Sequence, residues 1–485
     1  MISSSRVADP EVSGMFRWQE FAAVAAAYLF VVFALCPGTR FIGFPVHHDD
    51  FNNLAHISFR WYPWRPVSSL ALVMLSRLGI PVYYASLHVL IVVYAFLSIG
   101  VLRRLLQVRS VPVLLLLPVG AAMLSYEHTV EYSKYTGLLT NLLSGVFAMI
   151  AMTLMVSGSG ELADRPSRPL SVKLMAAVWV FSALSFWSKE DFLPAVVLLA
   201  AYLAWQEART RRWLVTLGGL LMEAGLLFLY NRQMQSAFTQ STTGSYKPSF
   251  APLSILRTAY IYSIATPGAK AVFLLVACAV LWNCFGSARI PWNRLLAFLA
   301  ITSAIALPYL CLPDHVFPYY ALNWIVWEAG GGLLLLWKLW PDVRGASVVA
   351  ALAAACLFVT QPGRSGLTKW YSETANVNRN VFDSLSAHRA RLQPYPAVAV
   401  EGAPFHGPWF GVDGEFIRNR LHLDHVWLVR VPRGSEYMRT SLQLLGKDVN
   451  GDVKTVAMES GAVSPDMPLL KLSADGTGTV EYPAR

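Results

Sequence analysis

Charged residues are scarce in this chain of 485 residues, where they make up 14% of the sequence. Soluble proteins carry roughly a quarter, so an ordinary soluble domain is excluded. Apolar residues make up 55% and form continuous stretches, many close to the ~20 residues that cross a bilayer as a helix. Because these stretches do not alternate polar with apolar residues, membrane strands are excluded too. The composition predicts an all-α polytopic membrane protein.

Cysteine is also rare, and all five cysteines fall in or beside apolar stretches. The polar C-terminal segment therefore has no disulfide, and no Cys/His spacing indicates a zinc site. The sequence shows no internal repeat of the kind found in many transporters. The net charge of +10 does not indicate nucleic-acid binding, because many Lys and Arg residues lie in short loops between apolar stretches.

About eleven apolar stretches are predicted to span the membrane as helices. They cover residues 19–37, 82–102, 111–125, 137–156, 173–187, 192–207, 213–230, 269–285, 294–312, 320–340 and 345–360. The stretch 66–79 is too short to span and carries Arg77, so we expect a helix along the membrane surface. No signal-peptide cleavage site follows the first stretch, which we expect to remain as a span.

Basic residues orient these spans. Every second loop is short and basic, as at Arg103-Arg104 and Arg211-Arg212, which is typical of cytoplasmic loops. We therefore expect a cytoplasmic lead, 1–18, followed by a membrane domain, 19–360. The other loops, and the tail that follows an odd number of spans, should lie outside. These outer segments are 38–81, 126–136, 188–191, 231–268, 313–319 and the tail 361–485.

The tail is long enough for a small domain. Trp370 to Leu392 has helical spacing of apolar residues. Short strands are predicted at Ala397–Val400, Val426–Val431, Val453–Met458 and Leu469–Leu472. The tail is therefore expected to form a small extracytoplasmic α+β domain that rests on the outer surface.

The first outer loop contains His47-His48-Asp49-Asp50. A carboxylate held there can remove a proton from an acceptor hydroxyl as a general base, although an ordinary hydrated loop explains the pair as well. His47 and His48 have three explanations: they tune the carboxylates, bind a divalent metal ion together with them, or are simply exposed.

Three cations in the outer loops, Arg65, Lys134 and Lys189, are suited to binding a lipid phosphate or diphosphate. The alternative is that they anchor the protein to anionic headgroups. Glu131 would orient Lys134 if their segment is helical. Lys189 and Glu190 lie between two spans with almost no loop, so each must pair, snorkel or line a wet cavity unless the turn is a solvated tip.

The order of these motifs resembles a known family. The acidic pair is followed by Arg65-Pro66, Leu78-Gly79-Ile80-Pro81, a helix with His88, Glu131…Ser133-Lys134, and Ser185–Glu190 leading into Leu193-Pro194. Over residues 15–345 this order resembles the GT-C superfamily of membrane glycosyltransferases. It is most similar to bacterial relatives of the dolichyl-phosphate-mannose-protein mannosyltransferases.

The resemblance implies an inverting glycosyltransferase of a bacterial cytoplasmic membrane that takes its sugar from a polyprenyl-phosphate carrier at the outer face. It assigns the base to Asp49 or Asp50. It assigns binding of the carrier phosphate to Arg65, Lys134 and Lys189, with Glu131 and Glu190 in support. Relatives often have an Arg before the late aromatic pair; here Phe317-Pro318-Tyr319-Tyr320 has none, and His315 is the candidate substitute. The sugar, the acceptor (protein, lipid or glycan) and any divalent metal ion are left open.

A transporter or flippase for a lipid-linked or polar solute is the main alternative. Glu223 and Glu328, each inside a predicted span, suit this alternative, although a carboxylate hydrogen-bonded within the bundle explains them as well. Transporters bind solute near the bilayer midplane, whereas the charges here gather in the outer loops. A non-catalytic assembly factor for envelope polysaccharide also stays open.

Overall fold

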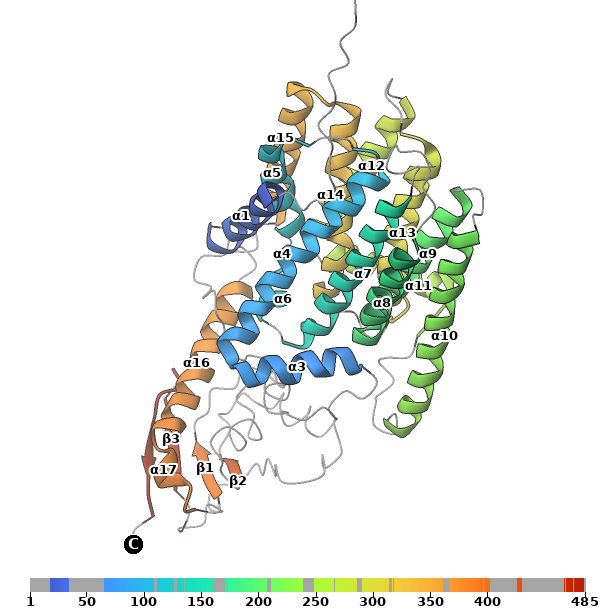
Figure 1. Cartoon of the computed structure of the whole chain (residues 1–485). Coiled ribbons are helices and arrows are strands. Elements are labelled where there is room, and N and C mark those ends of the chain that lie inside the picture. Colours follow the sequence, from blue (N-terminus) through green and yellow to red (C-terminus); the bar gives the residue numbers. More distant parts are fainter. Residues whose placement is uncertain are drawn as a thin grey trace, which may run out of the picture.

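A computed structural model gives the structure over a set of ranges that we call the described residues. They are 18–34, 65–108, 111–125, 129–134, 136–159, 171–206, 211–238, 248–265, 267–285, 290–313, 316, 318–360, 367–395, 397–401, 425–429, 466, 468–473 and 475–483. Most of them are helical (Figure 1).

Each predicted apolar stretch coincides with one helix of a bundle. These helices are α1 (Trp18–Ala34), α4 (Ile80–Leu105), α5 (Val113–Leu124), α7 (Leu139–Gly158), α8 (Val172–Ser188), α9 (Leu193–Gln206), α10 (Arg211–Phe238), α12 (Pro267–Phe285), α13 (Trp292–Leu310), α14 (Leu322–Leu339) and α15 (Val343–Thr360). Among the described residues, four helices are long and apolar enough to span a membrane: Ile80–Leu105, Leu139–Gly158, Arg211–Tyr230 and Trp292–Leu310. The number of eleven spans stays a prediction.

Helix α14 forms the centre of the bundle, and almost all its side chains are buried. Its glycine run, Gly330 to Gly332, does not break the helix; it brings neighbouring helices close. A Cβ on Gly331 would overlap the ring of Phe298 on α13, and one on Gly330 would lie 2.9 Å from the sulfur of Met123 on α5. The small residues therefore serve close helix packing, as is common in membrane bundles.

The stretch predicted as a surface helix is α3 (Pro66–Leu78), which lies across one end of the bundle (Figure 1). Pro66 occupies the first helical turn, where its missing N–H costs no hydrogen bond. The helix ends at Gly79, whose φ of 105° is accessible mainly to glycine. Four short helical segments among the described residues connect the longer helices: α6 (Thr129–Lys134), η1 (Thr136–Leu138), η2 (Glu190–Phe192) and η4 (Pro318–Ala321). Segment α6 packs against η1 and η4, and η2 packs against α7 and α8.

Polar contacts at the opposite end link helix ends that the loop charges placed on one side. Arg103, at the end of α4, binds both carboxylate oxygens of Glu20, near the start of α1, at 2.9 Å. Lys338, at the end of α14, donates a hydrogen bond to the carbonyl of Gln107 at 2.9 Å. Which end faces the cytoplasm remains a prediction from the loop charges.

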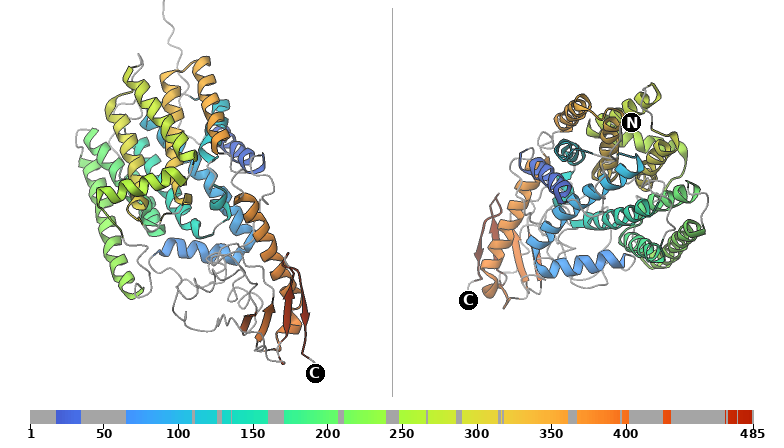
Figure 2. Two further views of the ribbon diagram at one scale, coloured as in Figure 1. Left: turned by 180° about the vertical axis from the view of Figure 1, so that it is seen from behind. Right: turned by 45° about the horizontal axis from the view of Figure 1, so that its top comes forward.

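The C-terminal part lies at the α3 end of the bundle (Figure 2). It contains α16 (Leu367–Ala387), α17 (Arg389–Leu392), β1 (Ala397–Glu401), β2 (His425–Val429), β3 (Leu469–Leu472) and β4 (Gly478–Glu481). The strands form a sheet in the order β2-β1-β3-β4, in which β4 alone runs antiparallel to its neighbour. The predicted α+β character is therefore present, while the predicted strand Val453–Met458 lies outside the described residues.

Candidate functional site

Among the described residues, the turn between α8 and α9 carries the most deeply buried charges at the α3 end of the bundle. Helix α8 ends because Lys189 has an extended backbone, and Leu193-Pro194 begins α9 directly after η2. Only 7% of Lys189 and 4% of Asp191 is exposed. The turn is therefore not a solvated tip, because two of its charged residues point into the bundle.

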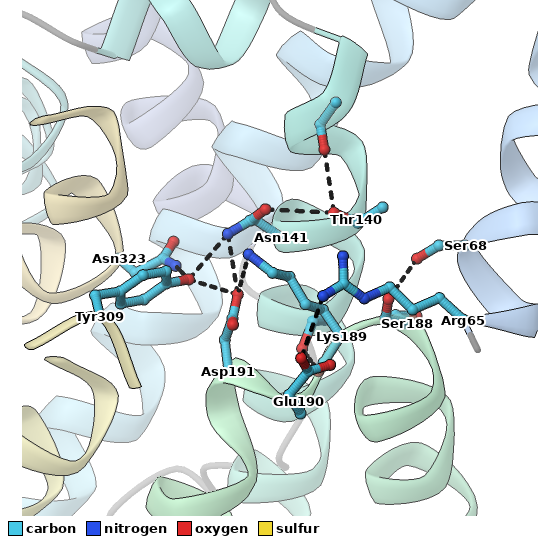
Figure 3. Close-up of polar contacts among 12 residues, drawn as sticks. Arg65, Ser68, Thr140, Asn141, Ser188, Lys189, Glu190, Asp191, Tyr309 and Asn323 are labelled. Atoms are coloured by element: carbon cyan, nitrogen blue, oxygen red, sulfur yellow. Dashed lines mark hydrogen bonds and ion pairs between the residues drawn. The ribbon is translucent and has the colours of Figure 1, made fainter. Parts of the chain in front are cut away.

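Two ion pairs join this turn to itself and to α3 (Figure 3). The Nζ atom of Lys189 lies 2.9 Å from Oδ2 of Asp191. Nη2 of Arg65, the residue that caps α3, lies 3.2 Å from Oε1 of Glu190. Nε of Arg65 is buried and has no hydrogen-bond partner among the described residues. A hydrogen bond from Ser68 to the carbonyl of Ser188, 2.8 Å long, fastens α3 over the end of α8.

Asp191 is held by side chains from other helices. Its Oδ2 atom accepts hydrogen bonds from Asn141 on α7, at 3.0 Å, and from the hydroxyl of Tyr309 on α13, at 2.5 Å. Asn323 on α14 donates to the same Tyr309 oxygen at 2.8 Å. The network crosses three helices of the bundle and ends at the Lys189–Asp191 pair (Figure 3).

Aromatic rings cover the ammonium of Lys189. Its Nζ atom lies 4.7 Å from the ring centroid of Tyr320 and 5.3 Å from that of Tyr309. The two rings stack on each other with centroids 4.6 Å apart. Cation–π contact of this kind favours a charged amine at a site that excludes water.

Burial and charge act in opposite directions on these groups. Burial lowers the pKa of the Lys189 ammonium; the Asp191 carboxylate offsets part of this lowering, and the Arg65 guanidinium adds to it. Burial disfavours the charged form of Glu190, but the charges of Arg65 and Lys189 outweigh it and hold the pKa of Glu190 below its ordinary value. Burial likewise opposes the charge of Arg65, yet Glu190 and Asp191 raise its pKa.

Of the residues singled out in the sequence, the structure brings Arg65, Lys189 and Glu190 together. Glu131 and Lys134 lie on α6, as the helical interpretation required, although their side chains are outside the description. The remaining candidates fall outside the described residues: His47, His48, Asp49, Asp50 and His315. Within the part of the chain that the structure covers, no three His, Cys, Asp or Glu side chains gather as a metal site.

Sequence reasoning gave no role to four residues of the network, Asp191, Asn141, Tyr309 and Asn323. Asp191 stood in the same polar turn as Lys189. Asn141 and Asn323 are amides near the ends of apolar helices, and a polar side chain at membrane depth is a signal of function or of a buried partner. That signal was available but did not show which partners the amides share.

The fold and the site together define a polytopic helical protein with a cluster of paired charges at one end of its bundle. No protein-family model matches the chain, and no curated protein matches it. Among solved structures, it is similar to ArnT from Cupriavidus metallidurans in the apo state, with 13% identity and a TM-score of 0.43, over 93% of this chain and 92% of that one. A likeness at this level fixes neither substrate nor reaction.

Proposed function

We propose that the chain is an inverting glycosyltransferase of the GT-C type. It moves a sugar from a polyprenyl-phosphate carrier to a hydroxyl acceptor at the outer face of a bacterial cytoplasmic membrane. The observation that carries the proposal is the meeting of Arg65 and Lys189 at one turn, under a helix that lies across the end of the bundle. Cations held at such a place suit a lipid-linked phosphate.

The reaction needs a base and a stabilised leaving group. Asp49 or Asp50 takes the proton of the acceptor hydroxyl, whose oxygen attacks the anomeric carbon from the face opposite the phosphate. The bond between that carbon and the phosphate oxygen breaks, and the lipid phosphate leaves with the electron pair. Because phosphate is a good leaving group, no carboxylic acid is required to protonate it, in contrast to a glycosidase.

The binding capacity of the site supports this assignment. Arg65 uses one nitrogen for Glu190, and its buried Nε has no partner among the described residues. A buried N–H without a partner costs free energy, which a phosphate oxygen would recover. Helix α6, which carries Glu131 and Lys134, packs against η1 and η4. Lys134 is assigned to the same phosphate, with Glu131 in support. His315 precedes η4 and is assigned a supporting role on the phosphate.

Sugar transfer tests the proposal directly. Membranes with the wild-type chain, Asp49→Ala, Asp50→Ala or both changes receive a panel of radiolabelled polyprenyl-phosphate sugars. We expect the wild-type chain to transfer the sugar and release the polyprenyl phosphate. One well-folded aspartate variant should lose this transfer. Transfer that survives the double replacement would place the base elsewhere. Divalent cations and a chelator in parallel reactions test whether transfer needs a metal ion, for which His47 and His48 are the candidate ligands.

One observation favours the transporter or flippase alternative. Oε2 of Glu223, within α10, is buried and has no hydrogen-bond partner among the described residues. An unpaired carboxylate inside a span is a feature of solute and proton pathways. Movement of a lipid-linked sugar across the membrane of proteoliposomes would favour that alternative if Glu223→Gln abolishes it and if the wild-type chain transfers no sugar.

A further inference from the structure

Asp191 has an uneven set of partners. One oxygen, Oδ2, receives three donors: the ammonium of Lys189 at 2.9 Å, the amide of Asn141 at 3.0 Å and the hydroxyl of Tyr309 at 2.5 Å. The carboxylate is thus fixed in direction by three charge-assisted contacts, which are the stronger kind of hydrogen bond.

The donors are themselves held. Asn323 donates to the Tyr309 oxygen at 2.8 Å, and its own backbone carbonyl accepts from the hydroxyl of Tyr94, on α4, at 2.7 Å. On the other side, Ser144 of α7 donates to the backbone carbonyl of Lys189 at 2.7 Å. The pair Lys189–Asp191 therefore has little freedom to move, because four helices of the bundle hold it in place.

The Asp191 carboxylate acts on the pKa of the Lys189 amine against burial and the charge of Arg65. Among the described residues, the ionisable groups around Lys189 are Arg65 at the start of α3, Glu190 and Asp191 on η2, Tyr309 on α13 and Tyr320 on η4. Helix α7 contributes uncharged groups, Asn141 and Ser144. Burial and Arg65 both favour the neutral amine. Of the carboxylates, Asp191 is in direct contact with Nζ. A neutral amine would not stabilise a phosphate.

We propose that Asp191 is a positioning residue, which holds the Lys189 ammonium in place and in its charged form where the donor phosphate binds; this role rests on the function proposed above. Asp191 acts through Lys189 and does not itself receive the acceptor proton. Tyr309 and Asn141 act one step further out, because they fix the direction of the Asp191 carboxylate.

The test compares Asp191→Asn with the wild-type chain. The charged form of Lys189 is lost as pH rises through its pKa, and without Asp191 that loss begins at a lower pH. We expect the KM for the polyprenyl-phosphate sugar to rise roughly tenfold to a hundredfold, with kcat changed less. The alkaline limb of the pH profile of kcat/KM should move to lower pH. Asp191→Glu keeps the charge and should leave that limb near its wild-type position.

Glu20→Gln is the matched control, because it also breaks a buried ion pair, at the far end of the bundle. A merely structural role for Asp191 predicts that both variants lower thermal stability and leave the alkaline limb in place. That result would overturn the proposal.

A second measurement does not depend on sugar transfer. Competitive acetylation of Lys189 as a function of pH, followed by mass spectrometry, reports the pKa of its amine in each purified full-length variant. A fall in Asp191→Asn alone supports the coupling, whereas equal values in all variants refute it. If no donor is consumed by any variant but this fall is observed, the proposed function fails and the coupling between Asp191 and Lys189 stands.

Discussion

Arg65 shows how a single side chain serves both the fold and the site. Its planar guanidinium bridges the start of α3 to Glu190 and still presents a buried Nε without a partner among the described residues. Lysine keeps the charge but loses this fork of donors. We predict that Arg65→Lys raises the KM for the lipid-linked donor about tenfold and changes kcat less. A tenfold change corresponds to the loss of one hydrogen bond to a charged group. Steady-state kinetics in detergent or proteoliposomes would measure it.

The control for this prediction lies on the same helix. Arg77 is exposed near the end of α3, so Arg77→Lys should leave the KM unchanged. An equal rise of KM in both variants would mean that α3 contributes only a diffuse positive charge to the donor site.

Glu190 gives a prediction about acid stability. Its pKa is held below the ordinary value, so its stabilising contribution is present at neutral pH and is lost as pH falls through the lowered pKa. The unfolding temperature of the wild type should exceed that of Glu190→Gln by a constant amount at neutral pH. The difference should shrink at a pH below about 4.3, the usual range for glutamate. Scanning fluorimetry across this pH range measures it; a difference that grows on acidification contradicts the assignment.

At this scale the sequence identified the charges but not their partners. Lys189, Glu190 and Arg65 were recognisable because a charge beside an apolar span must be paired or exposed to water. Asn141, Tyr309 and Asn323 were not, because an uncharged polar side chain in an apolar helix has many ways to be satisfied. Their contacts join residues far apart in the chain, such as Tyr309 and Asp191, and one sequence carries no signal of such a pairing.

At the scale of elements, Gly79 governs how α3 meets α4. It is the joint between them, with φ of 105° and ψ of 161°, a conformation almost restricted to glycine. A Cβ added at Gly79 would make only an ordinary van der Waals contact, with Cδ of Pro81 at 3.8 Å. Any destabilisation by a side chain there therefore comes from the backbone conformation. We predict that Gly79→Ala destabilises the protein by about 1–3 kcal/mol and weakens donor binding, since α3 carries Arg65. Thermal unfolding and donor KM measure both effects.

Gly100 is the control for that prediction. It lies inside α4, where an added Cβ meets nothing within 4 Å and φ is not positive. Alanine there should be neutral or stabilise by about 0.5–1 kcal/mol, because it favours the helix. If Gly100→Ala and Gly79→Ala have the same effect, the backbone conformation at the joint is not what glycine provides.

Hydropathy located the helices of the bundle because a buried or lipid-facing helix is apolar on all sides. Hydropathy missed the elements that carry polar residues. Helix α10 continues through polar residues to Phe238, beyond the predicted end at 230. Helix α11 (Pro252–Ala265) lies within the segment predicted as an outer loop, and β4 was not predicted. These elements are short or of mixed polarity, so their formation depends on packing that no local pattern records.

At the scale of the whole molecule, the contacts define two ends. The Glu20–Arg103 and Lys338–Gln107 contacts belong to one end, and α3, the charged turn and the C-terminal sheet belong to the other. The loop charges assign the first end to the cytoplasm. The proposed reaction requires this orientation, because the lipid-linked donor is used at the outer face.

Thiol labelling tests the orientation in a variant whose five native cysteines are replaced. Leu78→Cys, at the end of α3, and Val343→Cys, at the start of α15, place single thiols at exposed positions at opposite ends. A maleimide that does not cross membranes should label Leu78→Cys in intact cells and Val343→Cys only after permeabilisation. The reverse pattern would invert the topology and put the charged turn in the cytoplasm, where an outer-face glycosyltransferase cannot work. Labelling of both thiols in intact cells would mean that the two ends of the bundle do not lie on opposite sides of a membrane. The prediction that the basic loops are cytoplasmic would then be wrong.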